Sequence, residues 1–145
     1  MITPDNIAEY NARFQQMEPR DILKEILPAI PNITLSFSGA EDVALLAMAC
    51  KLKPDLAVFT LDTGRLHPQT YQFIEKVRET FGISIEFMYP DTQAIEKLTR
   101  EKGLFSFYKD GHEECCAIRK TEPLRRKLAT VDAWITGQRR DQSPT

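Results

Sequence analysis

The stretch ITLSFSGAED, residues 33–42, decides the fold class of this protein. Its first five residues are mostly apolar, with β-branched and aromatic side chains, which is typical of a short buried strand. A serine and a glycine then form a turn, and an apolar run that ends before Lys53 and Pro54 predicts a helix over 41–52. One strand therefore leads directly into one helix.

The same alternation occurs twice more along the chain. Strands are predicted over 56–61 and 83–88, and helices over 68–81 and 92–102. Strands that alternate with helices form parallel sheets with right-handed crossovers. We therefore expect an α/β fold, a parallel twisted sheet with helices on both faces.

The flanks of this pattern extend the same fold. Apolar residues recur at helical spacing over 4–27, and Pro19 divides them into two helices. Beyond Gly103 we expect a helix over 114–128 and a fourth strand over 133–136. No linker or internal repeat interrupts the chain, so we expect a single domain over residues 1–145.

Ligands of open α/β sheets bind at the carboxyl ends of the strands. The loops that follow the four predicted strands are therefore expected to converge on one site. These loops begin after Phe37, Leu61, Met88 and Thr136.

Composition excludes several classes of protein. A length of 145 residues and a mass of 16.6 kDa provide about one domain, and the 42% hydrophobic and 28% charged residues are those of an ordinary globular protein. The longest apolar stretch, Val43–Cys50, is too short to cross a bilayer. The N-terminus lacks the pattern of a secretory signal, and the odd count of three cysteines fits a reducing compartment, so we expect a cytoplasmic protein with no membrane partner.

Positive charge gathers late in the chain. Residues 111–145 hold seven Lys and Arg against five Asp and Glu, although the formal net charge of the whole chain is -2. This excess is too small for a duplex nucleic acid but is enough for a small anion.

The first candidate loop is SFSGAED, residues 36–42. A helix N-terminus with a small turn and serine hydroxyls is suited to hold a phosphate. The loop lacks the lysine of a kinase-type P-loop and two of the three glycines of the dinucleotide fingerprint. A serine-capped turn without a ligand is the alternative.

The second candidate loop is LDTGRLHP, residues 61–68. Asp62 and Thr63 could hydrogen-bond a ribose or a base, and Arg65 could face an anion. His67, before a proline, is more often a capping or packing residue than a catalytic base. Two such loops on neighbouring strands would form a nucleotide crevice.

The third element surrounds Cys115 and Cys116. A disulfide between adjacent cysteines is strained, so metal ligation is the better use of the pair, although only two of the four ligands of a closed site are here. Buried structural thiols are the alternative, and Cys50 is expected to be core filler. Arg119 and Lys120 follow at helical spacing and could offset thiolate charge or meet a substrate anion.

The last motif is GQRRDQSPT, residues 137–145. Its guanidinium groups, from Arg139 and Arg140, are suited to grip a phosphate or a sulfate. A solvated charged segment is the usual alternative, but its place after the fourth strand favours a role in binding.

Together these motifs closely resemble those of the assimilatory adenylyl-sulfate (adenosine 5'-phosphosulfate) reductases, within the phosphoadenylyl-sulfate reductase family. The segments SFSGAEDV, LDTGRLHP, ECCAIRK and GQRRDQS stand in the family's order. The resemblance implies the adenine nucleotide alpha hydrolase-like fold and a nucleotide-binding domain. ATP-cleaving relatives read SGGXDS, whereas Ala40 and Val43 replace two of these residues here. The cysteine pair likewise favours adenylyl sulfate over its 3'-phosphorylated form.

The resemblance implies that adenylyl sulfate is reduced to sulfite and AMP, with thioredoxin as electron donor, in sulfate assimilation and cysteine biosynthesis. It implies a 4Fe-4S cluster with Cys115 and Cys116 as two of its four ligands. Ser36, Ser38 and Gly39 would hold the α-phosphate, and Leu61 and Asp62 would lie by the nucleoside. The sulfate end would meet Arg119, Lys120, Arg139 and Arg140. The remaining substrate-binding candidates are Asp42, Thr63 and Gly137.

The chain departs from the family at its end, Thr145. Family members carry a second cysteine pair and a nucleophilic cysteine further on, so we expect the domain to be truncated at its C-terminus and inactive alone. Two alternatives stay open: an ATP pyrophosphatase-type adenylyltransferase of the same fold, and a non-catalytic adenine nucleotide-binding module. The sequence also leaves open a homo-oligomer.

Overall fold

The computed structural model describes residues 1–142, apart from the side chain of Arg140. Contacts divide the chain into two compact units. Unit 1 comprises Met1–Val58 and the segment from Val131 onward, and unit 2 comprises Phe59–Thr130.

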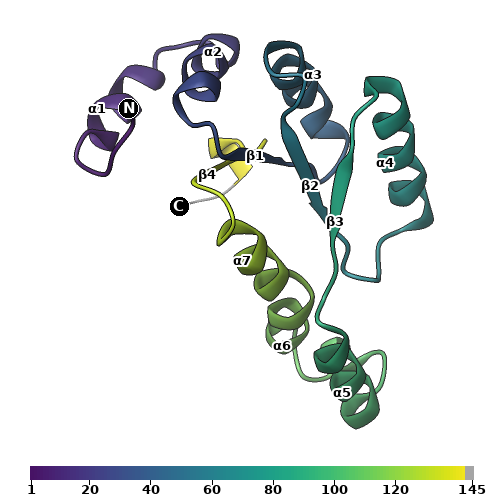
Figure 1. Ribbon diagram of the computed structural model, residues 1–145. Coiled ribbons are helices and arrows are strands. Elements are labelled where there is room, and N and C mark those ends of the chain that lie inside the picture. Colours follow the sequence, from purple (N-terminus) through teal and green to yellow (C-terminus); the bar gives the residue numbers. More distant parts are fainter. Residues whose placement is uncertain (143–145) are drawn as a thin grey trace. The chain divides into compact units, whose positions relative to one another are not determined.

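A four-stranded sheet has the order β3-β2-β1-β4. The strands are β1 (Ile33–Ser36), β2 (Ala57–Leu61), β3 (Ile85–Met88) and β4 (Ala133–Ile135). Within unit 1, β1 and β4 are parallel neighbours, with Ile33 opposite Ala133 and Leu35 opposite Ile135 (Figure 1). The predicted parallel α/β fold class is confirmed, although each of the four strands is one or two residues shorter than predicted.

Unit 1 contains three α-helices. They are α1 (Ile7–Phe14), α2 (Pro19–Ala29) and α3 (Val43–Leu52), and a 3₁₀ turn, η1 (Ala40–Asp42), precedes α3. Pro19 begins α2, as the predicted break at this residue requires, because a proline lacks the amide that a helix interior needs. α2 packs against α3. The buried apolar side chains of this unit include Leu23, Leu35, Phe37 and Leu46.

Unit 2 contains the helices α4 (Pro68–Phe81) and α5 (Thr92–Lys102), whose bounds coincide with those predicted. Gly82 ends α4 in the left-handed conformation, with φ of 60°. Asp91 caps α5 by accepting a hydrogen bond from the Ala94 amide at 2.9 Å. Phe59, Ile74 and Leu98 are among the buried side chains of this unit.

The predicted helix over 114–128 is present as one helical run, whose middle is a π-helical turn. A short 3₁₀ turn, η2 (Ser106–Tyr108), comes first, followed by α6 (Glu113–Cys116), a π-helical turn η3 (Ala117–Thr121) and α7 (Glu122–Leu128). Figure 1 shows α6 and α7 as one continuing helical run. Pro123 explains the π turn, because it has no amide to donate to the Arg119 carbonyl and its ring would clash with that group in a regular α-helix.

Within the described part of the chain, no helix has the length and the apolar run that a bilayer crossing requires.

Candidate functional site

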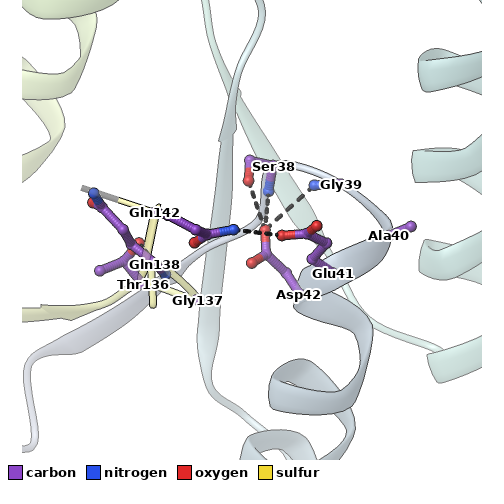
Figure 2. Close-up of a pocket in the computed structure, with 9 residues that line it drawn as sticks. All are labelled: Ser38, Gly39, Ala40, Glu41, Asp42, Thr136, Gly137, Gln138 and Gln142. Atoms are coloured by element: carbon purple, nitrogen blue, oxygen red, sulfur yellow. Dashed lines mark hydrogen bonds between the residues drawn. The ribbon is translucent and has the colours of Figure 1, made fainter. Parts of the chain in front are cut away.

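A polar pocket of about 460 Å³ lies in unit 1, where the loop after β1 meets the segment after β4 (Figure 2). It brings together two of the loops that the sequence predicted to converge. The lining residues are Ser38, Gly39, Ala40, Glu41, Asp42, Thr136, Gly137, Gln138 and Gln142.

The Asp42 carboxylate occupies the donors of the first loop. Its Oδ2 accepts hydrogen bonds from the Ser38 amide at 2.6 Å, the Ser38 hydroxyl at 2.7 Å and the Gly39 amide at 3.3 Å (Figure 2). Asp42 is buried. The donors that the sequence assigned to a phosphate are therefore satisfied by the chain's own acid, with which an incoming anion would have to compete.

Gly137 allows the carboxylate to lie where it does. A Cβ added at Gly137 would lie 2.1 Å from Oδ1 of Asp42 and 3.2 Å from its Cγ. The need for a glycine at position 137, two residues after the end of β4, comes from this close approach.

The rim of this pocket is acidic, with one cation held in ion pairs. Glu41 accepts a hydrogen bond from the Gln142 amide at 2.8 Å and lies 3.6 Å from the Arg139 guanidinium. Arg139 also lies 3.3 Å from Asp141. Among the described lining residues there are two carboxylates and no lysine or arginine. The side chain of Arg140 is outside the described part of the structure, and Ser36 is half-buried at the end of β1.

The second candidate loop, in unit 2, is held by its own side chains. The buried Asp62 carboxylate accepts hydrogen bonds from the Gly64 amide at 2.8 Å and the Tyr71 hydroxyl at 2.7 Å. The Thr63 hydroxyl accepts one from the Arg65 amide at 3.2 Å. The bond to Asp62 raises the pKa of Tyr71 above its usual value. Leu61 ends β2 and is half-buried.

A second pocket, of about 210 Å³, lies beside this loop in unit 2. It gathers the cysteine pair with three cationic side chains, and its lining residues include no carboxylate among those described. They are Thr63, Arg65, Phe107, His112, Cys115, Cys116, Arg119 and Lys120. Such a pocket is suited to negative charge.

The three cationic side chains of this pocket differ in how strongly their own contacts restrain them. Arg65 donates to the Leu104 carbonyl at 2.5 Å and lies 4.7 Å from the centre of the Phe107 ring. Arg119 is buried and donates to the Thr63 carbonyl at 2.6 Å. Lys120 is exposed. Lys120 is thus the cation with the least restraint among those that line the pocket.

Cys115 and Cys116 are free, half-buried thiols at the end of α6. Their donor chemistry fits thiolate ligation of iron, and the cationic lining would offset thiolate charge. Within the described residues no group of three or more His, Cys, Asp or Glu side chains could hold a metal ion. Cys50 lies on α3, outside the lining of both pockets, and burial raises the pKa of its thiol.

Sequence reasoning did not identify Tyr71 or Phe107 as part of these sites. Tyr71 lies on α4 and reaches back to Asp62, and Phe107 lies on η2 beside Arg65. Neither position carries a local signal, because aromatic residues at such spacing more often form part of a core.

Comparisons with known proteins show which family the chain belongs to. The profile of the phosphoadenosine phosphosulfate reductase domain matches residues 32–145. The chain is 55% identical over 145 residues to an adenosine 5'-phosphosulfate reductase of Pseudomonas aeruginosa, covering 99% of this chain and 54% of that protein. It is 49% identical over 141 residues to the chloroplastic 5'-adenylylsulfate reductase 1 of Arabidopsis thaliana, covering 97% of this chain and 30% of that protein. The chain thus spans about half or less of the length of these relatives.

A solved structure shows the same fold. The phosphoadenylyl-sulfate (PAPS) reductase from Candida auris, crystallised as a phosphate complex, superposes with a TM-score of 0.80 at 23% sequence identity, covering 98% of this chain and 71% of that one. The fold is therefore the adenine nucleotide alpha hydrolase-like fold that the resemblance implied. The profile match over most of the chain and the high identity of its relatives show that the chain belongs to the phosphoadenosine phosphosulfate reductase domain family.

Proposed function

We propose that this chain is part of an enzyme that reduces adenylyl sulfate to sulfite and AMP. Family membership and the names of its relatives support the reaction class. The observation that carries the proposal is the pocket in unit 2, which joins a cysteine pair to three cations and, among its described lining residues, no carboxylate. Such a lining favours an oxyanion beside sulfur ligands.

We propose Cys115 and Cys116 as two of the four ligands of a 4Fe-4S cluster. When bound, the cluster would supply a polarisable charged group beside the anionic end of the substrate. The chain's own residues set the environment of the two thiols. Lys120 and Arg119 lie three to five residues further on and add positive charge to the same pocket.

Lys120 is the residue that we assign to the sulfate end of the substrate. It is exposed, it lines the pocket and its ammonium group is free to meet an oxyanion. Arg139 is a weaker candidate for this role, because Glu41 and Asp141 already lie close to its guanidinium.

The pocket in unit 1 is proposed to take the uncharged nucleoside. Its described lining offers carbonyl, amide and hydroxyl groups with two carboxylates, a setting that suits hydroxyls and a base better than a phosphate. Glu41 and Asp42 would repel a further phosphate on the ribose, which supports the preference for adenylyl sulfate over its 3'-phosphorylated form.

The finer assignments rest on the family resemblance. We propose thioredoxin as the electron donor, sulfate assimilation and cysteine biosynthesis as the pathway, and the cytoplasm as the location. A nucleophilic cysteine that is not among the residues of this chain would attack the sulfate sulfur, forming an S–S bond to it as the S–O bond to AMP breaks. The thioredoxin dithiol would then cleave the resulting thiosulfonate, giving a thioredoxin disulfide, the free cysteine thiol and sulfite.

Calorimetric titration of the chain tests the proposal. Adenylyl sulfate and AMP are expected to bind. Lys120→Ala is expected to weaken the affinity for adenylyl sulfate by about tenfold and to leave the affinity for AMP nearly unchanged. Arg125→Ala is the matched control, because Arg125 is an exposed cation outside the pocket lining.

Two outcomes would contradict this reading. A folded chain that binds neither nucleotide would remove the proposed substrate class. Release of pyrophosphate from ATP would instead favour an ATP-cleaving adenylyltransferase of the same fold.

A further inference from the structure

The guanidinium of Arg119 is buried without an ion-pair partner in the described part of the chain. Only 8% of the residue is exposed, and its Nε has no hydrogen-bond partner. Burial of a charged group is unfavourable unless the group is paired or fully hydrogen-bonded. Arg119 therefore contributes little to stability by itself, and its place in the structure needs another reason.

Among the described residues, the Arg119 side chain donates one hydrogen bond, and its acceptor lies in a distant loop. Its NH1 group donates to the Thr63 carbonyl at 2.6 Å, across 56 residues of sequence. The same NH1 would lie 3.4 Å from a Cβ added at Gly64, whose φ is 74°. The guanidinium thus lies directly against the backbone of residues 63–64.

The loop it contacts is already held on its other side. Asp62 accepts hydrogen bonds from the Gly64 amide and from Tyr71 of α4. These contacts fix the shape of the loop and join it to α4. They do not join it to the segment that carries the cysteines, and Arg119 provides that link.

Arg119 lies on the π-helical turn that follows the cysteine pair. Cys116 lies three residues before it, and Thr63, Cys115, Cys116 and Arg119 all line the same pocket. π turns within helices occur frequently at functional sites. Here the turn carries the one described side chain that hydrogen-bonds the Thr63 carbonyl.

We propose that Arg119 is a positioning residue, which clamps the 62–65 loop to the cysteine-bearing segment and so sets the shape of the pocket between them. This role differs from the sulfate contact that the family resemblance implied for it. Its importance for catalysis rests on the proposed function. The clamp itself is a property of the free chain and can be tested without a nucleotide.

Hydrogen exchange measured by mass spectrometry tests the clamp. Arg119→Met, which keeps much of the volume but removes the charge and the donors, is expected to speed exchange of the 62–66 amides by about tenfold. Exchange in β1, which lies in unit 1, should stay unchanged. Arg125→Met is the matched control, since Arg125 is exposed on α7 and outside the pocket.

Two further variants separate the clamp from simple packing. Arg119→Lys keeps the charge and one donor, and Arg119→Gln keeps a donor without charge. Slower loop exchange in either variant than in Arg119→Met supports a hydrogen-bonded clamp. Should Arg119→Met fail to fold, Arg119→Leu, which also lacks a donor, takes its place: faster exchange of the 62–66 amides than in Arg119→Lys supports the clamp, and exchange equal to that of the unmodified chain overturns it.

Thermal unfolding separates a positioning role from a purely structural one, because a purely structural role would change Tm. Because the buried charge is poorly compensated, Arg119→Met is expected to shift Tm little, while adenylyl sulfate binding weakens by about tenfold. Unaltered loop exchange in a folded Arg119→Met variant would overturn the clamp. If the unmodified chain binds no adenylyl sulfate, the proposed function fails and the exchange result still decides the clamp.

Discussion

At the scale of single residues, two buried aspartates organise the two candidate loops. Asp42 accepts three hydrogen bonds from Ser38 and Gly39, and Asp62 accepts two, from Gly64 and Tyr71. Both residues follow strands in the sequence, where ligand contacts are expected. In the structure each carboxylate first satisfies its own loop, so each shapes a site before any ligand arrives.

Gly137→Ala tests the packing around Asp42. The added methyl would overlap Oδ1 of Asp42, so the variant is expected to lose about 1–3 kcal/mol of unfolding free energy and most AMP affinity. Urea unfolding and calorimetry measure both. Gly39→Ala is the control for stability, because Gly39 is extended and has nothing within 4 Å of an added Cβ. Equal stabilities of the two variants would refute the close approach.

Tyr71→Phe tests the anchor on Asp62. Loss of the hydroxyl is expected to cost about 1 kcal/mol at neutral pH. The raised pKa of Tyr71 means that the unfolded chain ionises first, so this stabilisation is present at neutral pH and is lost as pH rises above the ordinary tyrosine value of about 10. Urea unfolding from pH 7 to 11 should show the gap between the two proteins narrowing. A gap that widens with pH would contradict the assignment.

At the scale of elements, the helical run that carries the cysteines departs from regular α-helical geometry. Pro123 interrupts the α-helical hydrogen bonds, and the π turn η3 accommodates it between α6 and α7. The turn also carries Arg119 and Lys120, the two cations that follow the thiols. The turn that interrupts the α-helix is therefore also the segment that places two cations in the pocket.

Gly82→Ala tests the end of α4. Gly82 has a positive φ of 60° and open space around an added Cβ, so the cost is backbone strain alone, about 1 kcal/mol. Gly82→Asn should cost less, because asparagine tolerates the left-handed conformation. Thermal unfolding measures both changes. AMP binding by the two variants should match that of the unmodified chain, and a change in affinity would place Gly82 nearer to the chemistry than its position suggests.

At the scale of the whole molecule, the described residues provide two thiols in one pocket and no larger set of metal ligands. A four-thiolate cluster on this chain alone therefore requires thiols from a second copy. Each unit carries one of the two pockets. Unit 1 carries the acidic polar pocket, and unit 2 carries the cationic pocket with the cysteines.

Reconstitution with iron and sulfide under anaerobic conditions tests this count of ligands. Cluster-bearing material formed by the 145-residue chain is expected to elute as a dimer with one cluster per two chains, while the apo chain stays smaller. Light scattering and iron analysis measure this ratio. The Cys115→Ser, Cys116→Ser double variant should hold none. A full cluster on a monomer would show that other residues complete the ligand set.

Local patterns in the sequence predicted the α/β class, the order of the elements and the four motifs. The sequence also predicted the bounds of α4 and α5, those of α4 from the local signals Pro68 and Gly82. The cysteine pair and the cations that follow it could likewise be located from spacing alone. Each of these features depends on neighbours within a few residues, which a linear pattern records.

The partners that these residues contact could not be predicted from local patterns. The occupation of the first loop by Asp42 depends on Gly137, which lies 95 residues away in the sequence, and the burial of Arg119 depends on the carbonyl of Thr63, 56 residues before it. The π turn arises because Pro123 interrupts the α-helical hydrogen bonds, while packing keeps the chain helical on both sides of the turn. Contacts between distant segments follow from how the chain packs, and no local pattern of residues encodes them.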